Sequence, residues 1–213
     1  MSLERQMKTG EVYVEFGHTS PEDIAYEKKI EEQRIVCKER CFAYNQTPPS
    51  DIARREEILG ELLGSAGKGL WMEPPIHFAY GCNTHIGSHV YANFNLTVVD
   101  DGEVFIGDYT MFAPNVVIST TGHPIHPMYR DKGAQFSLPV HIGAHVWIGS
   151  NVVILPGVTI GDNSVIGAGS VVTHDVPPDT VAYGVPCRAV RAITQEDLLR
   201  VRSGVDINED WNG

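Results

Sequence analysis

The chain has 213 residues, with 16 basic and 27 acidic side chains and a net charge of −11, and its length suits one large domain or two small ones. Such an acidic chain is a poor candidate for nucleic-acid binding, which depends on a high density of lysine and arginine. No apolar run approaches the roughly 20 residues of a membrane span, and the first 20 residues are too polar for a secretory signal. We therefore expect a globular cytoplasmic protein without nucleic-acid or membrane partners, whose four cysteines are reduced thiols.

Residues 1–68 are predicted to form a helical cap. The run Ser20-Pro21-Glu22-Asp23 combines an N-cap residue, a proline in the first turn and acids that complement the helix dipole, so it predicts a helix that reaches about Tyr44. The run Pro48-Pro49-Ser50-Asp51 ends this helix and begins a second one, which Gly64 ends. We expect both helices to cover an open end of the domain that follows.

Residues 69–191 contain a repeat of six residues. One aliphatic residue recurs at every sixth position, glycine often follows it, and a small or β-branched residue comes four positions after it. The same pattern begins earlier, at Ile86-Gly87, and shifts by two residues near Asp101-Gly102. The aliphatic positions are Ile142, Ile148, Ile154, Ile160, Ile166 and Val172, and the second set is Val146, Val152, Val158, Ser164, Ser170 and Val176.

A period of six fits short strands that each end in a turn, with one aliphatic side chain of every strand pointing inward. Three such units close a triangular coil, and coils stack through backbone hydrogen bonds at about 4.8 Å. We expect the glycines to provide the tight or left-handed backbone of the corners. The repeat therefore predicts an all-β solenoid, the hexapeptide parallel β-helix.

The six-residue pattern fails in a loop at residues 119–139, and a loop of this length inside a compact solenoid is more often functional than idle. The loop holds His123 between Gly122 and Pro124. A histidine held in this way is a candidate general base near neutral pH, and the alternative is a solvated loop histidine.

Two arginines, Arg188 and Arg191, lie at the end of the last coil. Guanidinium groups placed together on an otherwise acidic solenoid indicate an anionic ligand, since arginine suits phosphate. The alternative is that they neutralise Asp175 or Asp179. Residues 192–213 are polar and predict a short helix followed by a frayed tail.

Several motifs together resemble the galactoside and maltose O-acetyltransferases of the hexapeptide acyltransferase superfamily. The resemblance implies a left-handed β-helix, a homotrimer, and acetyl-CoA bound as co-substrate in grooves between neighbouring subunits, with no metal required. The motifs are Met7-Lys8-Thr9-Gly10-Glu11-Val12-Tyr13, Tyr91-Ala92-Asn93-Phe94-Asn95, Val99-Asp100-Asp101, Gly122-His123-Pro124, Val146-Trp147-Ile148-Gly149-Ser150, Gly167-Ala168-Gly169-Ser170-Val171-Val172-Thr173 and Gly184-Val185-Pro186-Cys187-Arg188.

The same resemblance implies roles for individual residues. His123 matches the catalytic histidine, which would take a proton from an acceptor hydroxyl during direct transfer of the acetyl group. Asn93 and the backbone N–H of Ser150 match groups that stabilise the tetrahedral intermediate. The implied acceptor-binding residues are Asp101, Ala79 and Tyr91, and the implied coenzyme-binding residues are Asn93, Ser150, Ala168, Thr173, His174, Arg188 and Arg191.

The chain departs from the family pattern at three places. Ala79 stands where galactoside-acetylating relatives have a serine, and His174 stands where close relatives often have lysine. The segment from Glu15 to Asp23 is longer than in the family, so either acid is a candidate for the acceptor-binding acid near the N-terminus. The acceptor is therefore predicted to be a sugar of the galactoside, glucoside or maltose type, used weakly and broadly.

Two other functions remain open from the sequence alone. Hexapeptide-repeat carbonic anhydrases hold zinc with three histidines, and this chain offers His85, His89, His123, His126, His141 and His145. Histidines four residues apart form a ligand pair on a helix, but on a six-residue coil four steps cross a corner. The other function is that of a binding module with this fold and no catalytic activity.

Overall fold

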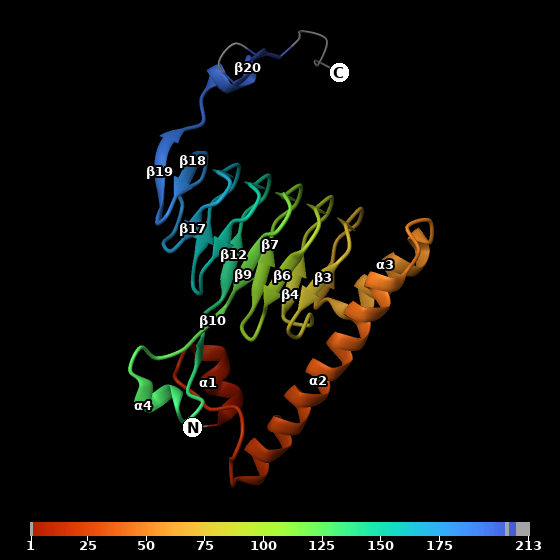
Figure 1. Ribbon diagram of the computed structural model, residues 1–213, viewed down its shortest axis with the longest axis vertical. Helices are drawn as coiled ribbons and strands as arrows, with labels where there is room; N and C mark the ends of the chain where they lie inside the picture. Colours follow the sequence, from red (N-terminus) through yellow and green to blue (C-terminus); the bar gives the residue numbers. More distant parts are fainter. Residues whose placement is uncertain (1, 203–204, 208–213) are drawn as a thin grey trace.

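The computed structural model describes residues 2–202 and 205–207, and a parallel β-helix with helices at its N-terminal end dominates it (Figure 1). The predicted all-β solenoid with an N-terminal helical cap and a long inserted loop is confirmed. The faces of the solenoid are three sheets whose strands are parallel, apart from the last strand of the second sheet.

The three sheets are built from very short strands, one for each side of each coil. The first sheet contains β1 (Ser65–Ala66), β4 (Thr84–Ile86), β7 (Val104–Ile106), β12 (Val140–Ile142) and β15 (Thr159–Ile160). The second sheet contains β2 (Trp71–Met72), β5 (Tyr91–Ala92), β8 (Met111–Phe112), β13 (Trp147–Ile148), β16 (Val165–Ile166), β18 (Thr180–Gly184) and β19 (Cys187–Ala192). The third sheet contains β3 (Ile76–Phe78), β6 (Leu96–Val99), β9 (Val117–Ser119), β14 (Val153–Ile154) and β17 (Val171–Val172).

The repeat residues fill the interior of the solenoid. Every residue of both repeat sets is buried, with an exposed fraction of 5% or less, and the apolar ones belong to one continuous core together with residues of the helical cap. Apolar burial of this kind is the main favourable contribution to folding. The six-residue period therefore encodes the core, as predicted.

The length of a coil changes at one corner. Paired residues are 18 positions apart in the C-terminal coils, as for Trp147 and Val165, but 20 apart in the N-terminal ones, as for Tyr91 and Met111. The extra residues lie between the third and first sheets, in segments 79–83 and 100–103, and the loop at 120–139 leaves the solenoid at this same corner. This corner is the enlarged corner of the solenoid.

The expectation for the glycines that follow the aliphatic residues is wrong in one respect. The left-handed backbone lies two residues later, for example at His145 (φ 57°) and Asn151 (φ 58°), where mostly non-glycine residues adopt it. The glycines are needed because the next coil approaches closely. A Cβ atom on Gly161 would lie 2.3 Å from the backbone nitrogen of Pro178.

This close approach gives a prediction for stability. Replacing Gly161 by alanine is expected to destabilise the protein by about 1–3 kcal/mol or more, because the atoms that the new methyl group meets are backbone and cannot rotate away. A Cβ atom on Gly60, in helix α3 (Ile52–Leu62), would meet no other atom within 4 Å, so Gly60→Ala is expected to stabilise by about 1 kcal/mol. Denaturant unfolding measures both changes, and equal midpoints for Gly161→Ala and the unchanged protein would contradict the explanation.

The helical cap forms where the sequence predicts it. Helix α2 (Pro21–Gln46) begins at Ser20, whose hydroxyl accepts from the backbone N–H of Asp23, and α3 begins at Asp51, which accepts from that of Arg54. The Tyr44 hydroxyl donates to the Met72 carbonyl at 2.6 Å, which ties α2 to the first coil. Among the described residues, no helix is both long and apolar enough to cross a membrane.

The remaining elements lie at the two ends of the chain and on the inserted loop. Helix α1 (Leu3–Thr9), for which the sequence gives no signal, lies beside the loop, whose own elements are β10 (Thr121–Gly122), α4 (Pro127–Arg130) and β11 (Phe136–Ser137) (Figure 1). The predicted C-terminal helix is a 3-10 helix at Gln195–Leu198, followed by β20 (Arg200–Arg202) and β21 (Val205–Asp206). The rest of the predicted tail lies outside the described residues.

Candidate active site

The predicted site residues lie on two different corners of the solenoid. Asn93, Ser150 and Ala168 follow strands of the second sheet, so they stack on the corner between the second and third sheets. Ala79, Asp101, Thr173 and His174 follow strands of the third sheet and lie at the next corner, from which the loop with His123 also leaves.

One chain does not bring the two groups together. Strand β6, which separates Asn93 from Asp101, spans roughly 13 Å at 3.3 Å per residue. The loop with β10 and α4 also points away from the hairpin of β18 and β19, which carries Arg188 and Arg191 (Figure 1). The predicted residues therefore form two separate groups on one chain.

His123 is held in one tautomer by the inserted loop. Strand β10 pairs with β11, which places His123 beside the returning strand. The ring Nδ1 lies 2.9 Å from the carbonyl oxygen of Ala134. A carbonyl only accepts, so Nδ1 carries the proton and the neutral ring presents a lone pair at Nε2, the form that a general base requires.

Asp101 lies at the enlarged corner with a second carboxylate and a guanidinium. The Arg34 guanidinium, on α2, forms ion pairs with Glu15 and with Asp101, and it lies 4.9 Å from the centre of the Tyr80 ring. Burial and the Glu15 charge raise the pKa of Asp101, while the Thr121 hydroxyl and Arg34 lower it. The arrangement offers acceptors and donors to a ligand with several hydroxyl groups.

Glu15, rather than Asp23, is the N-terminal acid at this corner. Asp23 accepts from the backbone N–H of Leu3 and from the Ser20 hydroxyl, so its carboxylate joins α1 to the start of α2. Sequence reasoning missed Arg34, because no local pattern marks one arginine of a polar helix as the partner of an acid 67 positions later.

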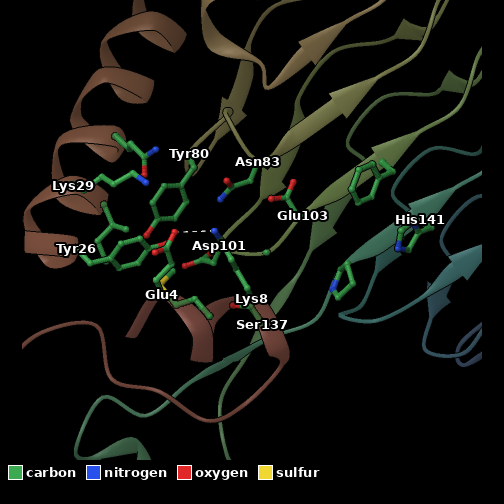
Figure 2. A pocket seen from close by; sticks show the side chains of 16 residues that line it. Glu4, Lys8, Tyr26, Lys29, Tyr80, Asn83, Asp101, Glu103, Ser137 and His141 are labelled. Atoms are coloured by element: carbon green, nitrogen blue, oxygen red, sulfur yellow. Dashed lines mark hydrogen bonds and ion pairs between the residues drawn. The ribbon is translucent and has the colours of Figure 1, made fainter. Parts of the chain in front are cut away.

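A cavity of about 430 Å³ opens beside Asp101, between α1, α2 and the enlarged corner (Figure 2). Tyr80, Asn83 and Ser137 line it together with Asp101, and the lysines Lys8 and Lys29 lie at its edge. This volume is within the range of small-molecule sites.

The Ala79 side chain is not among those that line the cavity. Its side chain packs against the small apolar cluster that includes Tyr80, and its backbone N–H donates to the carboxylate of Asp100 at 3.1 Å. Asp100 is fully buried and also accepts from the Tyr80 N–H and the Thr84 hydroxyl, and burial raises its pKa to about 6. Asp100 thus fixes the backbone of segment 79–83, which carries two residues of the cavity wall.

The candidate coenzyme residues are exposed or partly exposed. The Arg188 guanidinium donates to the carbonyl of the adjacent Cys187 at 2.8 Å and otherwise lies on the surface. Arg191 forms two hydrogen bonds, of 2.7 and 2.8 Å, with the carboxylate of Asp197 in the 3-10 helix. At the enlarged corner, the Thr173 hydroxyl and His174 Nδ1 lie 2.8 Å apart.

Comparison with known proteins identifies the family. Residues 6–67 match the maltose acetyltransferase hexapeptide capping motif, and residues 139–174 match the bacterial transferase hexapeptide with its six repeats. The chain is 53% identical over 168 residues to the galactoside O-acetyltransferase of Escherichia coli K12, covering 79% of this chain and 83% of that protein. The chain belongs to the hexapeptide-repeat O-acetyltransferases.

Two solved structures extend the likeness of this O-acetyltransferase family member to nearly its whole length. A galactoside acetyltransferase in complex with coenzyme A superimposes with a TM-score of 0.89 at 44% identity, covering 98% of this chain and 99% of that one. A maltose O-acetyltransferase from Clostridium difficile 630 gives a TM-score of 0.83 at 42% identity, covering 92% and 99%. The resemblance inferred from the sequence motifs is therefore confirmed.

Four of the six histidines considered as zinc ligands alternate with aromatic rings instead. Phe105 stacks between His85 and His141 at 5.0 and 4.9 Å between ring centres, and Tyr109 stacks between His89 and His145 in the same way. Among the described residues of this O-acetyltransferase family member, no three His, Cys, Asp or Glu side chains are grouped as metal ligands would be. The family matches name acetyltransferases, which favours acyl transfer over zinc chemistry.

Proposed function

We propose that this protein transfers an acetyl group from acetyl-CoA to a hydroxyl group of a sugar, in active sites that form between the subunits of a homotrimer. The observation that carries the proposal is the hydrogen bond from His123 Nδ1 to the Ala134 carbonyl, because in the neutral ring it places the lone pair at Nε2, on an exposed arm. The relatives named galactoside and maltose O-acetyltransferase, one of them bound to coenzyme A, support the same reaction.

In the proposed mechanism, Nε2 of His123 takes the proton of the acceptor hydroxyl while the hydroxyl oxygen attacks the thioester carbonyl. The negative charge of the tetrahedral intermediate is stabilised by the backbone N–H of Ser150, with assistance from Asn93. Such preorganised donors contribute about 3–4 kcal/mol each. When the intermediate collapses, the thiolate of CoA leaves and takes the proton back from His123, so that no covalent acyl-enzyme forms.

The acceptor is proposed to be a sugar of the galactoside, glucoside or maltose type. Glu15 and Asp101 offer carboxylate oxygens that each accept from two hydroxyls, and Arg34 offers donors between them. A polyol satisfies both kinds of group at once. Ala79 offers a sugar no polar side-chain group, and Tyr91 is proposed to contact the acceptor from the neighbouring subunit.

The trimer is proposed because it joins the two corners and covers an apolar face. Trp71, Tyr91, Met111 and Trp147 follow one another up the second sheet, pointing outward with 36–52% of their surface exposed. A contiguous apolar column of this kind is typical of a surface that contacts another chain. In the proposed assembly, the His123 arm of one subunit reaches the Asn93 corner of the next.

A panel of acceptors tests the proposal. Purified protein, acetyl-CoA and sugars, amines or amino alcohols are combined, and CoA release is followed with a thiol reagent. We expect release with galactosides, glucosides or maltose, unchanged after treatment with a chelator. Bound zinc in a metal assay, with no CoA release, would support the zinc protein instead. Acetyl-CoA binding without release for any acceptor, in a protein free of zinc, would support the non-catalytic binding module.

The two arginines near the end of the solenoid give a prediction for coenzyme binding. Arg188→Ala and Arg191→Ala are each expected to raise the KM for acetyl-CoA about tenfold with little change in kcat, because contacts with remote phosphates are made equally in the ground and transition states. Arg54→Ala, which removes a guanidinium paired with Glu57 on α3, is the matched control and should leave KM unchanged. A loss confined to kcat would show that the arginines do not contact the coenzyme.

A further inference from the structure

The N-terminal segment and the His123 arm form one three-stranded ribbon. Tyr13 and Gln135 exchange both backbone hydrogen bonds, at 2.8 and 2.9 Å, alongside the pairing of β11 with β10. Gln135 follows Ala134, whose carbonyl orients His123, and Tyr13 precedes the acceptor acid Glu15 by two residues. The backbone thus connects the proposed base with part of the proposed acceptor site.

A chain of hydroxyl groups crosses the three strands of this ribbon. The Tyr13 hydroxyl lies 2.6 Å from Ser137 Oγ, which lies 3.1 Å from Thr121 Oγ1. Thr121 lies two residues before His123, and its hydroxyl lowers the pKa of Asp101. Tyr13 and Ser137 are both 2% exposed, so their hydroxyl groups depend on each other rather than on water.

The carboxylate of Asp101 determines which hydroxyl group donates and which accepts at each step of this hydrogen-bond chain. A carboxylate only accepts, so a Thr121 hydroxyl turned toward Asp101 accepts from Ser137, and Ser137 accepts from Tyr13. All three hydroxyl groups then point toward Asp101, and hydrogen bonds aligned in this way strengthen one another. Burial raises the pKa of Tyr13 to about 12, so its hydroxyl keeps its proton at any working pH.

We propose that Tyr13 is a positioning residue of the acceptor site: its hydroxyl begins a chain that holds Asp101, and the arm with His123, in the arrangement that receives the acceptor. The inference rests on the proposed function and adds a residue that does not itself touch the acceptor. Removing the Tyr13 hydroxyl breaks the chain at its origin and leaves Ser137 free to turn away from Thr121.

Several charged and polar groups around Asp101 together determine its pKa. Burial and the Glu15 charge oppose ionisation of Asp101, whereas Arg34 and the Thr121 hydroxyl favour it. A broken chain weakens the Thr121 contribution, so the pKa of Asp101 rises and its carboxylate is lost at a higher pH. The titratable and charged groups that share its cavity or pair with it are Glu4, Lys8, Glu15, Tyr26, Lys29, Arg34, Tyr80, Glu103 and His141.

The test compares Tyr13→Phe with Tyr44→Phe. Tyr44 is equally buried, and its hydroxyl has a comparable bond of 2.6 Å to a carbonyl far from the arm, so both variants lose one buried hydrogen bond. We expect Tyr13→Phe to raise the acceptor KM about fivefold and to move the acid limb of kcat/KM for the acceptor to higher pH, with the KM for acetyl-CoA unchanged. Tyr44→Phe should change thermal stability alone.

A double-mutant cycle with Ser137→Ala tests the chain itself. If Tyr13 acts through Ser137, the double variant should bind the acceptor no more weakly than the worse single variant, whereas independent sites would add their effects. Acceptor affinity measured by calorimetry separates this inference from the proposed reaction, which is judged from turnover by the unchanged protein. An acceptor affinity and pH profile of Tyr13→Phe that match those of Tyr44→Phe, or additive effects in the cycle, would overturn the inference.

Discussion

Replacing His123 by alanine is expected to lower kcat by at least about 100-fold while acetyl-CoA still binds. The expectation follows from the proposed role of Nε2, since a positioned general base contributes about 10²–10⁴-fold in the reactions where it has been measured. Initial rates at saturating acetyl-CoA and acceptor measure kcat, and a coenzyme titration of the inactive variant measures binding.

His126 provides the control for this substitution. It lies on the same arm, and its ring accepts from the backbone N–H of Met128 at the start of α4, so His126→Ala removes an imidazole from the arm without removing the base. We expect it to keep most of the wild-type rate. Near-full turnover by His123→Ala would remove His123 from the mechanism, and equal losses in both variants would indicate damage to the arm as a whole.

Mixing two inactive variants is expected to restore activity. His123→Ala damages the arm that leaves the enlarged corner, and Asn93→Ala damages the corner between the second and third sheets, so in the proposed homotrimer each variant lacks one half of every site. When the two are unfolded together and refolded at equal amounts, about a quarter of all sites pair an intact arm with an intact Asn93 corner, as random cyclic assembly requires. About a quarter of the wild-type rate should therefore return.

The mixing experiment has a matched control and a result that would contradict the shared site. A double variant that carries both substitutions in one chain, refolded with the unchanged protein at equal amounts, should give about the same quarter of intact pairings and serves as the matched control. Sedimentation verifies the trimer in each sample. No recovery in the mixed sample, despite mixed trimers, would mean that both residues serve the same site from one chain.

The solenoid is predictable from the sequence because its core is periodic. Each sixth residue faces inward, so a count along residues 142–172 gives the buried positions without knowledge of the loops. The helices that begin at Ser20 and Asp51 are predictable because capping depends on residues within one turn. Helix α1 escapes prediction, since its Ser2 cap makes no side-chain bond and seven residues carry little periodic signal.

The candidate site is only partly predictable. His123, Asn93 and Asp101 follow from family motifs, but the contacts of Glu15 with Arg34 depend on how α2 lies across the enlarged corner, which no local pattern determines. The bond between Arg191 and Asp197 similarly depends on where the chain turns after β19. The repeat predicts that the glycines are needed, but it does not predict the reason. A pattern along one coil does not show how closely the backbone of the next coil approaches.

The enlarged corner has a consequence for how acceptor preference changes within such proteins. Strands of neighbouring coils must stay in register, so the sheets tolerate no insertion. The corner between the third and first sheets already varies in length from coil to coil, through segments 79–83, 100–103 and 120–139. Mutations that lengthen or reshape this corner leave the opposite corner, with Ser150 and Ala168, untouched. In the proposed site, acceptor recognition is therefore free to change while the coenzyme contacts of Ser150 and Ala168 stay the same, and exchanging these three segments between relatives is the natural route to a new acceptor.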